Sequence, residues 1–149
     1  MENNSSREIR IVRVFKAPVD LMWEVWTSPE HIVNWWGPNG FTNTIHTMDV
    51  TEGGEWTLTM HGPDGKNYPN RSIFKEIIPL KKIVYEHFNP HFITTVLFEA
   101  KGQETQVDWS MLFDTAEARD IVVKAHNAAE GLKQNLDKLE VFLAARVGV

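Results

Sequence analysis

The sequence predicts an α+β domain in which a curved antiparallel β-sheet of about seven strands wraps around a long C-terminal α-helix. Two short helices are expected after the first strand. Two observations lead to this prediction. Residues 115–145 contain no proline and one glycine, and their apolar residues recur every three or four positions, which is the period of a helix face. Between residues 41 and 113 the period is two, and short turns separate the apolar runs.

The C-terminal helix is predicted as one continuous element from Thr115 to about Ala145. Asp114 followed by Glu117 is a start signal, with the aspartate as the capping residue. About thirty helical residues span roughly 45 Å, whereas a domain of this size has a radius of gyration of about 15 Å. The helix should therefore cross the molecule and be covered by the sheet along its apolar stripe, which consists of Ile121, Ala125, Ala128, Leu132, Leu136, Leu139 and Leu143.

The N-terminal region should contain a tail, a strand and two short helices. We expect residues 1–6 to be a frayed tail and residues 7–15 a strand with both faces partly covered. Ala17-Pro18 opens the first helix, with proline at its first position. Ser28-Pro29-Glu30 opens the second, with serine as the cap, and Trp35-Trp36-Gly37-Pro38 ends it.

Six further strands are expected in hairpin succession, which implies antiparallel neighbours. The turn Gly62-Pro63-Asp64-Gly65 has a clear physical basis, because proline presets φ and glycine accepts a positive φ. Pro69 and the polar residues around Ser72 suggest a bulge, which would invert the facing of every residue after it. No repeat or linker interrupts the chain, so residues 1–149 are expected to form a single domain. The six strands are predicted at residues 41–50, 55–61, 66–78, 83–88, 92–100 and 105–113.

Composition excludes several classes of function. A formal charge of −5 without a run of Lys or Arg argues against nucleic acid and anionic membranes as partners. The absence of cysteine excludes disulfides, a thiol nucleophile and cysteine metal sites. The polar segment 1–8 does not resemble a signal peptide, and no apolar run is long enough to span a membrane, so a cytoplasmic location is expected. Six tryptophans and eight phenylalanines are enough to line an apolar cavity as well as fill a core.

No metal or cofactor is expected. His87 and His91 are separated by a turn at Asn89-Pro90, and His126 and Glu130 share a helix face without an evident third ligand. The sequence contains no serine triad, phosphate loop or dinucleotide fingerprint.

An acid–base site would need an ionisable side chain inside a cavity. The candidates are Glu76, His87, Glu99 and His126, and a structural or surface role is the stronger interpretation of each. We therefore assign no catalytic residue.

The stronger prediction is a binding site made of aromatic and polar side chains. In this set, Tyr68 and Arg71 would each place a polar tip in an apolar cleft. The alternative is that Tyr68 caps a strand edge and Arg71 pairs with a surface acid. Gly131 costs about 1 kcal/mol relative to alanine within a helix, so it either packs closely against a bulky ring or widens the cavity and lets the helix bend. The predicted ligand-binding residues are Trp36, Trp56, Met60, Tyr68, Arg71, Phe74, His87, Phe92, Trp109, His126 and Gly131.

A joint pattern runs through most of the chain, at residues 13–18, 23–31, 35–38, 53–56, 62–65, 68–69 and 130–134. These segments resemble the activator of heat-shock protein 90 ATPase homologue family, which belongs to the SRPBCC or START-like (Bet v 1-like) superfamily. The resemblance implies a helix-grip fold with a cavity between sheet and helix that often takes an apolar or aromatic small molecule. Two departures, Ser72 where many relatives carry glycine and a single Gly131 where many have two, bear on the identity of the ligand.

Three functions remain open at this point. The first is a non-catalytic binding protein for a small apolar or aromatic molecule, and the composition leaves room for a homodimer. The second is an enzyme of the polyketide cyclase or hydratase kind, with Glu76, His87 or His126 as acid–base groups. The third is a chaperone-interacting module, ranked last because the co-chaperone domain normally acts with a separate partner-binding domain and this chain is too short to contain one.

Overall fold

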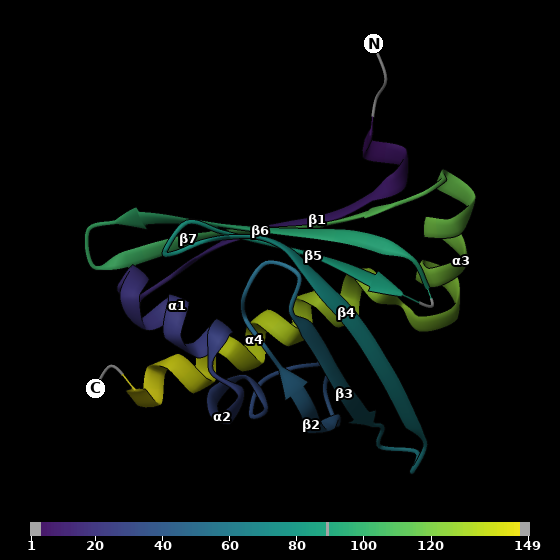
Figure 1. The fold of residues 1–149 in the computed structure, drawn as a ribbon, viewed down its shortest axis with the longest axis horizontal. Coiled ribbons are helices and arrows are strands. Elements are labelled where there is room, and N and C mark those ends of the chain that lie inside the picture. Colours follow the sequence, from purple (N-terminus) through teal and green to yellow (C-terminus); the bar gives the residue numbers. More distant parts are fainter. Residues whose placement is uncertain (1–3, 89, 147–149) are drawn as a thin grey trace.

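A curved antiparallel sheet holds one long helix against its concave side (Figure 1). The structure is a computed structural model that describes residues 4–88 and 90–146, without the side chains of residues 4, 5, 125 and 126. The predicted fold class is confirmed. After a 3-10 turn (Asn4–Arg7), the elements are β1 (Glu8–Phe15), α1 (Val19–Thr27), α2 (Pro29–Ile32), β2 (Thr42–Met48), β3 (Glu55–His61), β4 (Asn67–Ile78), β5 (Lys82–Phe88), β6 (Phe92–Lys101), β7 (Glu104–Phe113), α3 (Ala116–His126) and α4 (Ala128–Arg146).

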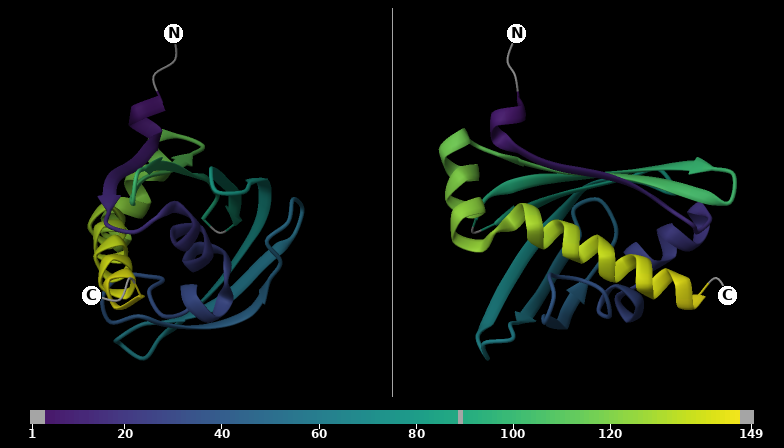
Figure 2. Two further views of the ribbon diagram at one scale, coloured as in Figure 1. Left: turned by 90° about the vertical axis from the view of Figure 1, so that its left-hand side faces the viewer. Right: turned by 180° about the vertical axis from the view of Figure 1, so that it is seen from behind.

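The strand order is β1-β7-β6-β5-β4-β3-β2, and every neighbouring pair is antiparallel. The hairpin succession from β2 to β7 therefore agrees with the prediction, and β1 joins the sheet beside β7. The left view of Figure 2 shows the sheet curving around α4, with α1 and α2 also inside the curve. This arrangement places the inner sides of β3, β4, β5 and β7 opposite α4.

The core lies between the inner face of the sheet and the helices. On β3, Trp56 and Leu58 are buried, and on β7 Val107, Trp109 and Phe113 are buried, as the alternation predicts. The later part of the predicted helix stripe is also confirmed, because Leu132, Leu136, Leu139 and Leu143 are all buried. These residues belong to one hydrophobic cluster that includes Trp35 and the buried side of α1.

The prediction of one continuous C-terminal helix is wrong, because the chain breaks at Asn127 into α3 and α4. Asn127 adopts a left-handed φ of 49° and donates its backbone N–H to Val123 O at 2.8 Å. Asparagine is one of the few residues that accept this conformation at a helix end. Ile121 is 59% exposed, so the first part of the predicted stripe does not face the sheet, and the side chain of Ala125 lies outside the described residues.

The helix starts differ from the prediction in detail. Thr115, not Asp114, caps α3, since its Oγ1 accepts the Ala118 N–H at 3.0 Å. Pro18 is the residue before α1 rather than its first residue. Ser28 precedes Pro29 in α2 as expected, but its side chain makes no capping hydrogen bond.

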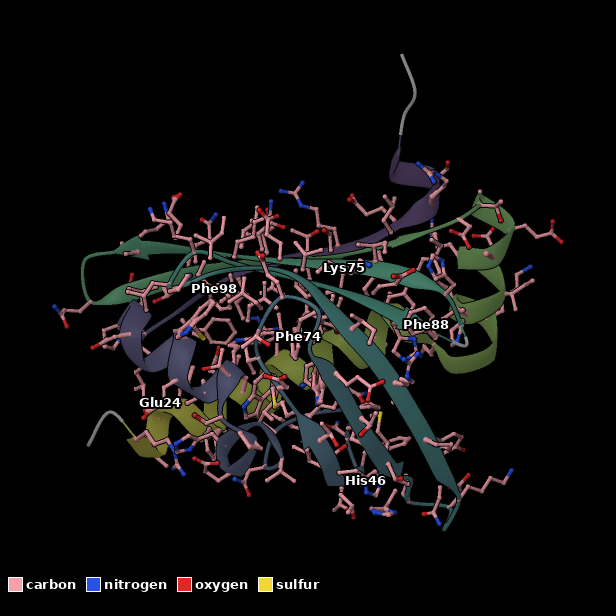
Figure 3. The ribbon with its side chains drawn as sticks, in the orientation of Figure 1. Glu24, His46, Phe74, Lys75, Phe88 and Phe98 are labelled. Carbon is pink, nitrogen blue, oxygen red and sulfur yellow. The ribbon has the colours of Figure 1, made fainter. Side chains whose placement is uncertain are left out.

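The predicted bulge near Ser72 is misplaced. The register between β3 and β4 is regular from Asn67 to Ile73, and the shift occurs later, between Phe74 and Glu76 against β5. As a result, Ser72 keeps the same facing as Phe74, and both side chains are buried. Figure 3 shows Phe74 on the concave side of the sheet, whereas Lys75 is exposed.

Two predictions for the N-terminal segment also need correction. Residues 4–6 of the expected tail, together with Arg7 of the expected strand, form the 3-10 turn, and residues 1–3 lie outside the described range. The second face of β1 is not covered, because Val12 and Val14 are 46% and 44% exposed.

Replacing Leu80 with glycine is expected to raise the free energy of unfolding by about 0.5–1 kcal/mol. Leu80 lies between β4 and β5 with a φ of +67° and is 41% exposed. A left-handed conformation costs a residue with a Cβ about 1–2 kcal/mol, and part of this gain is offset by the greater freedom of glycine in the unfolded chain. Urea unfolding would measure the change. Leu80→Ala keeps the Cβ and should not be stabilised, so equal gains in both variants would contradict the explanation.

Candidate functional site

A cavity of about 220 Å³ lies between the inner face of the sheet and the first half of α4, and it is partly open to solvent. An apolar cavity of about 150 Å³ is large enough to hold benzene, so this one suits a molecule of one or two rings. Its lining residues are Trp36, Gly37, Pro38, Trp56, Leu58, Met60, Asn70, Ser72, Tyr85, His87, Trp109, Met111, Ala128, Gly131, Leu132 and Asn135.

Three tryptophans form the aromatic side of the cavity. The Trp36 ring stacks on Trp109, with centroids 5.4 Å apart and planes at 21°, and lies 4.9 Å from Trp56. Behind Trp56, Phe74 stacks at 5.8 Å with an interplanar angle of 5°. Because Trp56 and Trp109 are only 3% exposed, these rings are held by packing and present flat apolar surface to the cavity.

Some polar groups of the lining have no protein partner. The Nε1–H groups of Trp56 and Trp109 are buried and meet no acceptor in residues 4–88 and 90–146. The Ser72 hydroxyl, in a side chain that is 4% exposed, likewise makes no hydrogen bond to the described part of the chain. A buried donor without a partner costs about 1–3 kcal/mol. The two indole N–H groups are fully enclosed, so the Ser72 hydroxyl is the donor that a molecule in the cavity can reach.

His87 is the ionisable group of the cavity with the most constrained surroundings. Its Nδ1 donates to the Pro90 carbonyl at 2.8 Å, and its Nε2 lies 2.8 Å from Asn70 Oδ1. The Phe92 ring stacks on the face of the imidazole, with the two ring centroids 4.4 Å apart. Burial lowers the pKa of His87 below its usual value, and the hydrogen bond to the Pro90 carbonyl acts in the opposite direction.

The neutral form of His87 leaves one contact unsatisfied. The Pro90 carbonyl can only accept, so the single proton of neutral imidazole sits on Nδ1 and Nε2 becomes an acceptor. The orientation of the Asn70 amide follows from its Nδ2, which donates to the Tyr68 carbonyl at 2.9 Å. Two acceptors, Nε2 and Asn70 Oδ1, therefore face each other unless Nε2 gains a proton.

The loop that carries Trp36 is tied to α4 by Asn135. Its Nδ2 donates to the Trp35 carbonyl at 2.8 Å, and its Oδ1 accepts the Gly37 N–H at 3.1 Å. Asn135 is 5% exposed, so both hydrogen bonds are buried. This side chain therefore fixes the position of the cavity wall formed by the loop.

Lys138, one helix turn further along α4, strengthens the same attachment. Its Nζ lies 3.4 Å from each of three backbone carbonyls, those of Trp36, Pro38 and Phe41. Burial lowers the pKa of Lys138, and the three carbonyl dipoles compensate the partly desolvated ammonium.

Gly131 faces the loop across the cavity edge. A Cβ built at this position would lie 3.7 Å from Pro38 Cβ, which is an ordinary contact distance, so a methyl group fits. Tight packing against a bulky ring is therefore not the reason for this glycine. The break in the helix lies four residues earlier, at Asn127, and Gly131 widens the cavity.

Six of the eleven predicted binding residues line the cavity. Phe74 and Phe92 lie behind the lining, stacked on Trp56 and His87. The residues that line it are Trp36, Trp56, Met60, His87, Trp109 and Gly131. Their role in binding stays a prediction.

Of the remaining predicted residues, Tyr68 and Arg71 lie outside the cavity lining. Tyr68 donates to Asp64 Oδ2 at 3.3 Å, and Arg71 pairs with Glu55 at 2.9 Å with half of its side chain exposed, so the surface interpretation applies to both. The side chain of His126 lies outside the described residues.

The carboxylates proposed as acid–base groups are on the surface. Glu76 pairs with Lys82 at 2.9 Å and Glu99 with Lys101 at 3.2 Å, and neither lines the cavity. Of the candidates whose side chains are described, His87 is the one in the cavity. No group of three His, Asp or Glu side chains in the described residues could hold a metal ion.

Several lining residues were missed. Three of them, Leu58, Asn70 and Tyr85, each lie two positions along a strand from a residue predicted to bind the ligand. For Asn70 and Tyr85, the facing could be predicted only with the bulge in its observed position, after Phe74. Asn135 could not be predicted as a lining residue from the sequence, because a polar residue beside the apolar stripe of a helix is ordinarily exposed to solvent. Burial raises the pKa of Tyr85 well above its usual range, so its hydroxyl remains neutral.

A second histidine near the site ties the β5–β6 turn to the start of α3. His91 Nε2 lies 2.7 Å from Glu86 Oε2, and Nδ1 lies 3.0 Å from both carboxylate oxygens of Asp114. These hydrogen bonds, that of Glu86 first, raise the pKa of His91, and the same bond lowers the pKa of Glu86.

His91→Gln is expected to destabilise the protein at acidic pH and to have little effect at alkaline pH. Because the pKa of His91 is raised in the folded protein, its ion pairs stabilise the fold fully below the pKa of about 6.5 that it has in the unfolded chain. This stabilisation is lost as the pH rises through the pKa of His91 in the folded protein. Urea midpoints of both proteins across the pH range would measure this. A difference that does not shrink as the pH rises would contradict the ion-pair explanation.

The chain matches the family model described as Activator of Hsp90 ATPase homolog 1-like protein over residues 16–144. The chain belongs to this family. The expected helix-grip fold is thereby confirmed. None of the curated proteins matches the chain.

Several solved structures share the fold. A protein of Nitrosomonas europaea has a TM-score of 0.89 at 20% identity, covering 99% of this chain and 100% of the other. A protein of Arthrobacter aurescens has a TM-score of 0.87 at 21% identity, covering 97% and 90%. An AHSA1-like protein of Aeromonas hydrophila has a TM-score of 0.76 at 16% identity, covering 93% of each chain. At these identities the similarity concerns the fold. No helix within the described ranges is long and apolar enough to cross a membrane.

Proposed function

We propose that this protein binds a small aromatic molecule in the cavity between the sheet and α4. The observation that carries the proposal is the tryptophan wall of a cavity of about 220 Å³. In this wall the centroid of the Trp36 ring lies 4.9 Å from that of Trp56 and 5.4 Å from that of Trp109. Flat rings bind between other flat rings with little loss of side-chain freedom, because packing already holds the tryptophans in place.

The cavity lining also supports binding by its mixture of groups. Leu58, Met60 and Leu132 add aliphatic surface, while Asn70, Ser72 and His87 cluster on neighbouring strands. Small-molecule sites commonly combine a largely apolar wall with a few polar groups that fix orientation. A ligand with an aromatic part and one polar substituent matches this distribution.

A second candidate is an enzyme of the cyclase or hydratase kind, favoured by the presence of His87 in the cavity with a lowered pKa. Both ring nitrogens of His87 already contact protein oxygens, and Tyr85 is the other ionisable residue of the lining. A general base needs a free nitrogen within reach of the substrate. Binding without reaction is therefore the proposal that the geometry supports better.

The test is thermal unfolding with three neutral amides of increasing size, benzamide, 2-naphthamide and 2-anthracenecarboxamide. The first two should raise the melting temperature, and the third, which has more fused rings than the one or two that the cavity suits, should raise it less. At a hundred times the dissociation constant the gain is about 2.7 kcal/mol, or several degrees for a domain of this size. No shift with any of the three at saturating concentration would refute binding in this cavity.

A further inference from the structure

The cavity offers one free hydrogen-bond donor, the hydroxyl of Ser72, and contains no charged side chain of fixed sign. None of its lining residues is Asp, Glu, Lys or Arg. The Ser72 hydroxyl makes no hydrogen bond to the residues that the structure describes. A ligand that completes this bond must bring an acceptor.

His87 supplies the charge that such a ligand would meet. Ser72 is its direct partner across β4 and β5, so the free hydroxyl lies beside the imidazole. In the neutral form, Nε2 and Asn70 Oδ1 are two acceptors 2.8 Å apart. When Nε2 carries a proton, it donates a hydrogen bond to Asn70 Oδ1. The Pro90 carbonyl and Asn70 Oδ1 therefore both accept hydrogen bonds when His87 is protonated on both ring nitrogens.

Few ionisable groups near His87 change the free energy of protonating its Nε2. The positive charge of His91, in the adjoining turn, disfavours it, and Tyr85 on the same face of β5 stays neutral. The groups that face the imidazole from other elements are uncharged: Asn70 and Ser72 of β4 and Phe92 of β6. A negative charge that would stabilise the imidazolium is therefore missing from the described protein groups.

We propose that the cavity selects a small aromatic carboxylate, which binds together with one proton taken up by His87. The inference rests on the proposed function and adds the charge of the ligand. The carboxylate enters ionised, one proton moves from solvent to Nε2, and no covalent bond of the ligand changes. Opposite charges a few ångströms apart in a poorly solvated site stabilise each other far more than in water.

The experiment compares 2-naphthoate with its neutral isostere 2-naphthamide by titration calorimetry. In buffers with different heats of ionisation, 2-naphthoate binding should take up about one proton and 2-naphthamide binding none. Above a pH of about 6.5, the apparent dissociation constant of 2-naphthoate should rise about tenfold for each pH unit until the pKa of His87 in the complex is reached. The constant of 2-naphthamide should not change with pH.

His87→Gln should remove both the proton uptake and the pH dependence. Near pH 6 it should weaken 2-naphthoate binding at least tenfold more than it weakens 2-naphthamide binding, a difference of about 1.4 kcal/mol. Ser72→Ala is a second variant that does not disturb the imidazole, and it should weaken 2-naphthoate by about fivefold through the loss of one hydrogen bond.

Two histidine variants serve as controls. His61→Gln changes a half-buried β3 residue that bonds Thr44 and Asn67, outside the cavity, and should leave every parameter unchanged. His91→Gln should preserve the proton uptake, which assigns the proton to His87.

The outcomes separate the two proposals. Equal affinity for both probes with no proton uptake, or tighter binding of the amide, overturns the charge selection and leaves aromatic binding intact. Failure of both probes to bind overturns the proposed function itself. Proton uptake that persists in His87→Gln overturns the assignment to His87.

Discussion

Gly131→Leu is expected to abolish 2-naphthamide binding and, at the same time, to stabilise the fold. The Cβ of residue 131 has room beside Pro38, and the rest of a leucine side chain would extend along a wall of the cavity. We expect the affinity to fall at least a hundredfold, or about 2.7 kcal/mol. The free energy of unfolding should rise by about 1 kcal/mol from helix propensity, with a further gain from apolar burial. Calorimetry and urea unfolding on the same preparation would measure both.

The matched control is Ala129→Leu, which places a leucine at an exposed position of α4 two residues earlier. It should leave binding unchanged. Gly131→Ala should be stabilised by about 1 kcal/mol and should bind the probe nearly as well as the wild type, because one methyl group occupies little of the cavity. Normal binding by Gly131→Leu would show that the probe sits elsewhere.

Asn135→Ala is expected to lower the free energy of unfolding by about 2–4 kcal/mol. It deprives two buried backbone groups, the Trp35 carbonyl and the Gly37 N–H, of their partners. Each group left unpaired costs about 1–3 kcal/mol. Probe affinity should also fall, because the loop that positions Trp36 loses its main attachment to α4. Urea unfolding, combined with calorimetry at a temperature where the variant is folded, would test both effects.

Gln134→Ala is the matched control for this prediction. Gln134 precedes Asn135 on α4 and accepts the Asn39 N–H at 3.1 Å, but at the surface, where water can replace the lost bond. Its effect on stability should stay within about 0.5 kcal/mol. Equal losses in the two variants would mean that the buried hydrogen bonds of Asn135 are not the source of its effect.

Most of the strands could be predicted because their signals are local. Alternation along residues such as Trp56, Leu58 and Met60 follows from one buried sheet face, and Pro-Gly turns mark where each strand ends. The observed strands begin and end within about two residues of the predicted ones in nearly every case. Antiparallel order then follows from the short turns, without knowledge of distant contacts.

The errors arose where a single residue decides between two backbone conformations. Asn127 interrupts a helix whose apolar period is the same on both sides, so periodicity gives no sign of the break. The bulge after Phe74 likewise follows no proline or glycine, while the conspicuous Pro69 lies in a regular stretch of β4. Tertiary packing selects these conformations.

The cavity was predicted in outline, and its polar part was not. Large aromatic residues on inward-facing strand positions indicate an apolar wall, which explains the successes at Trp56 and Trp109. The contribution of Asn70 depends on its two hydrogen bonds, one to His87 and one to a backbone carbonyl. A hydrogen bond between Asn70 and His87, which are 17 positions apart, can be predicted only when the register of β4 against β5 is known. The bulge predicted near Ser72 left that register undetermined.

The crowding of indole rings gives the protein an optical property. Trp26, Trp35, Trp36, Trp56 and Trp109 are joined by ring contacts of 4.9–6.0 Å, so light absorbed by one ring can pass to the others before it is emitted. Three of these rings border the cavity. A molecule that enters and quenches one of them should dim the fluorescence of the group, and the protein would report its own occupancy without an added label.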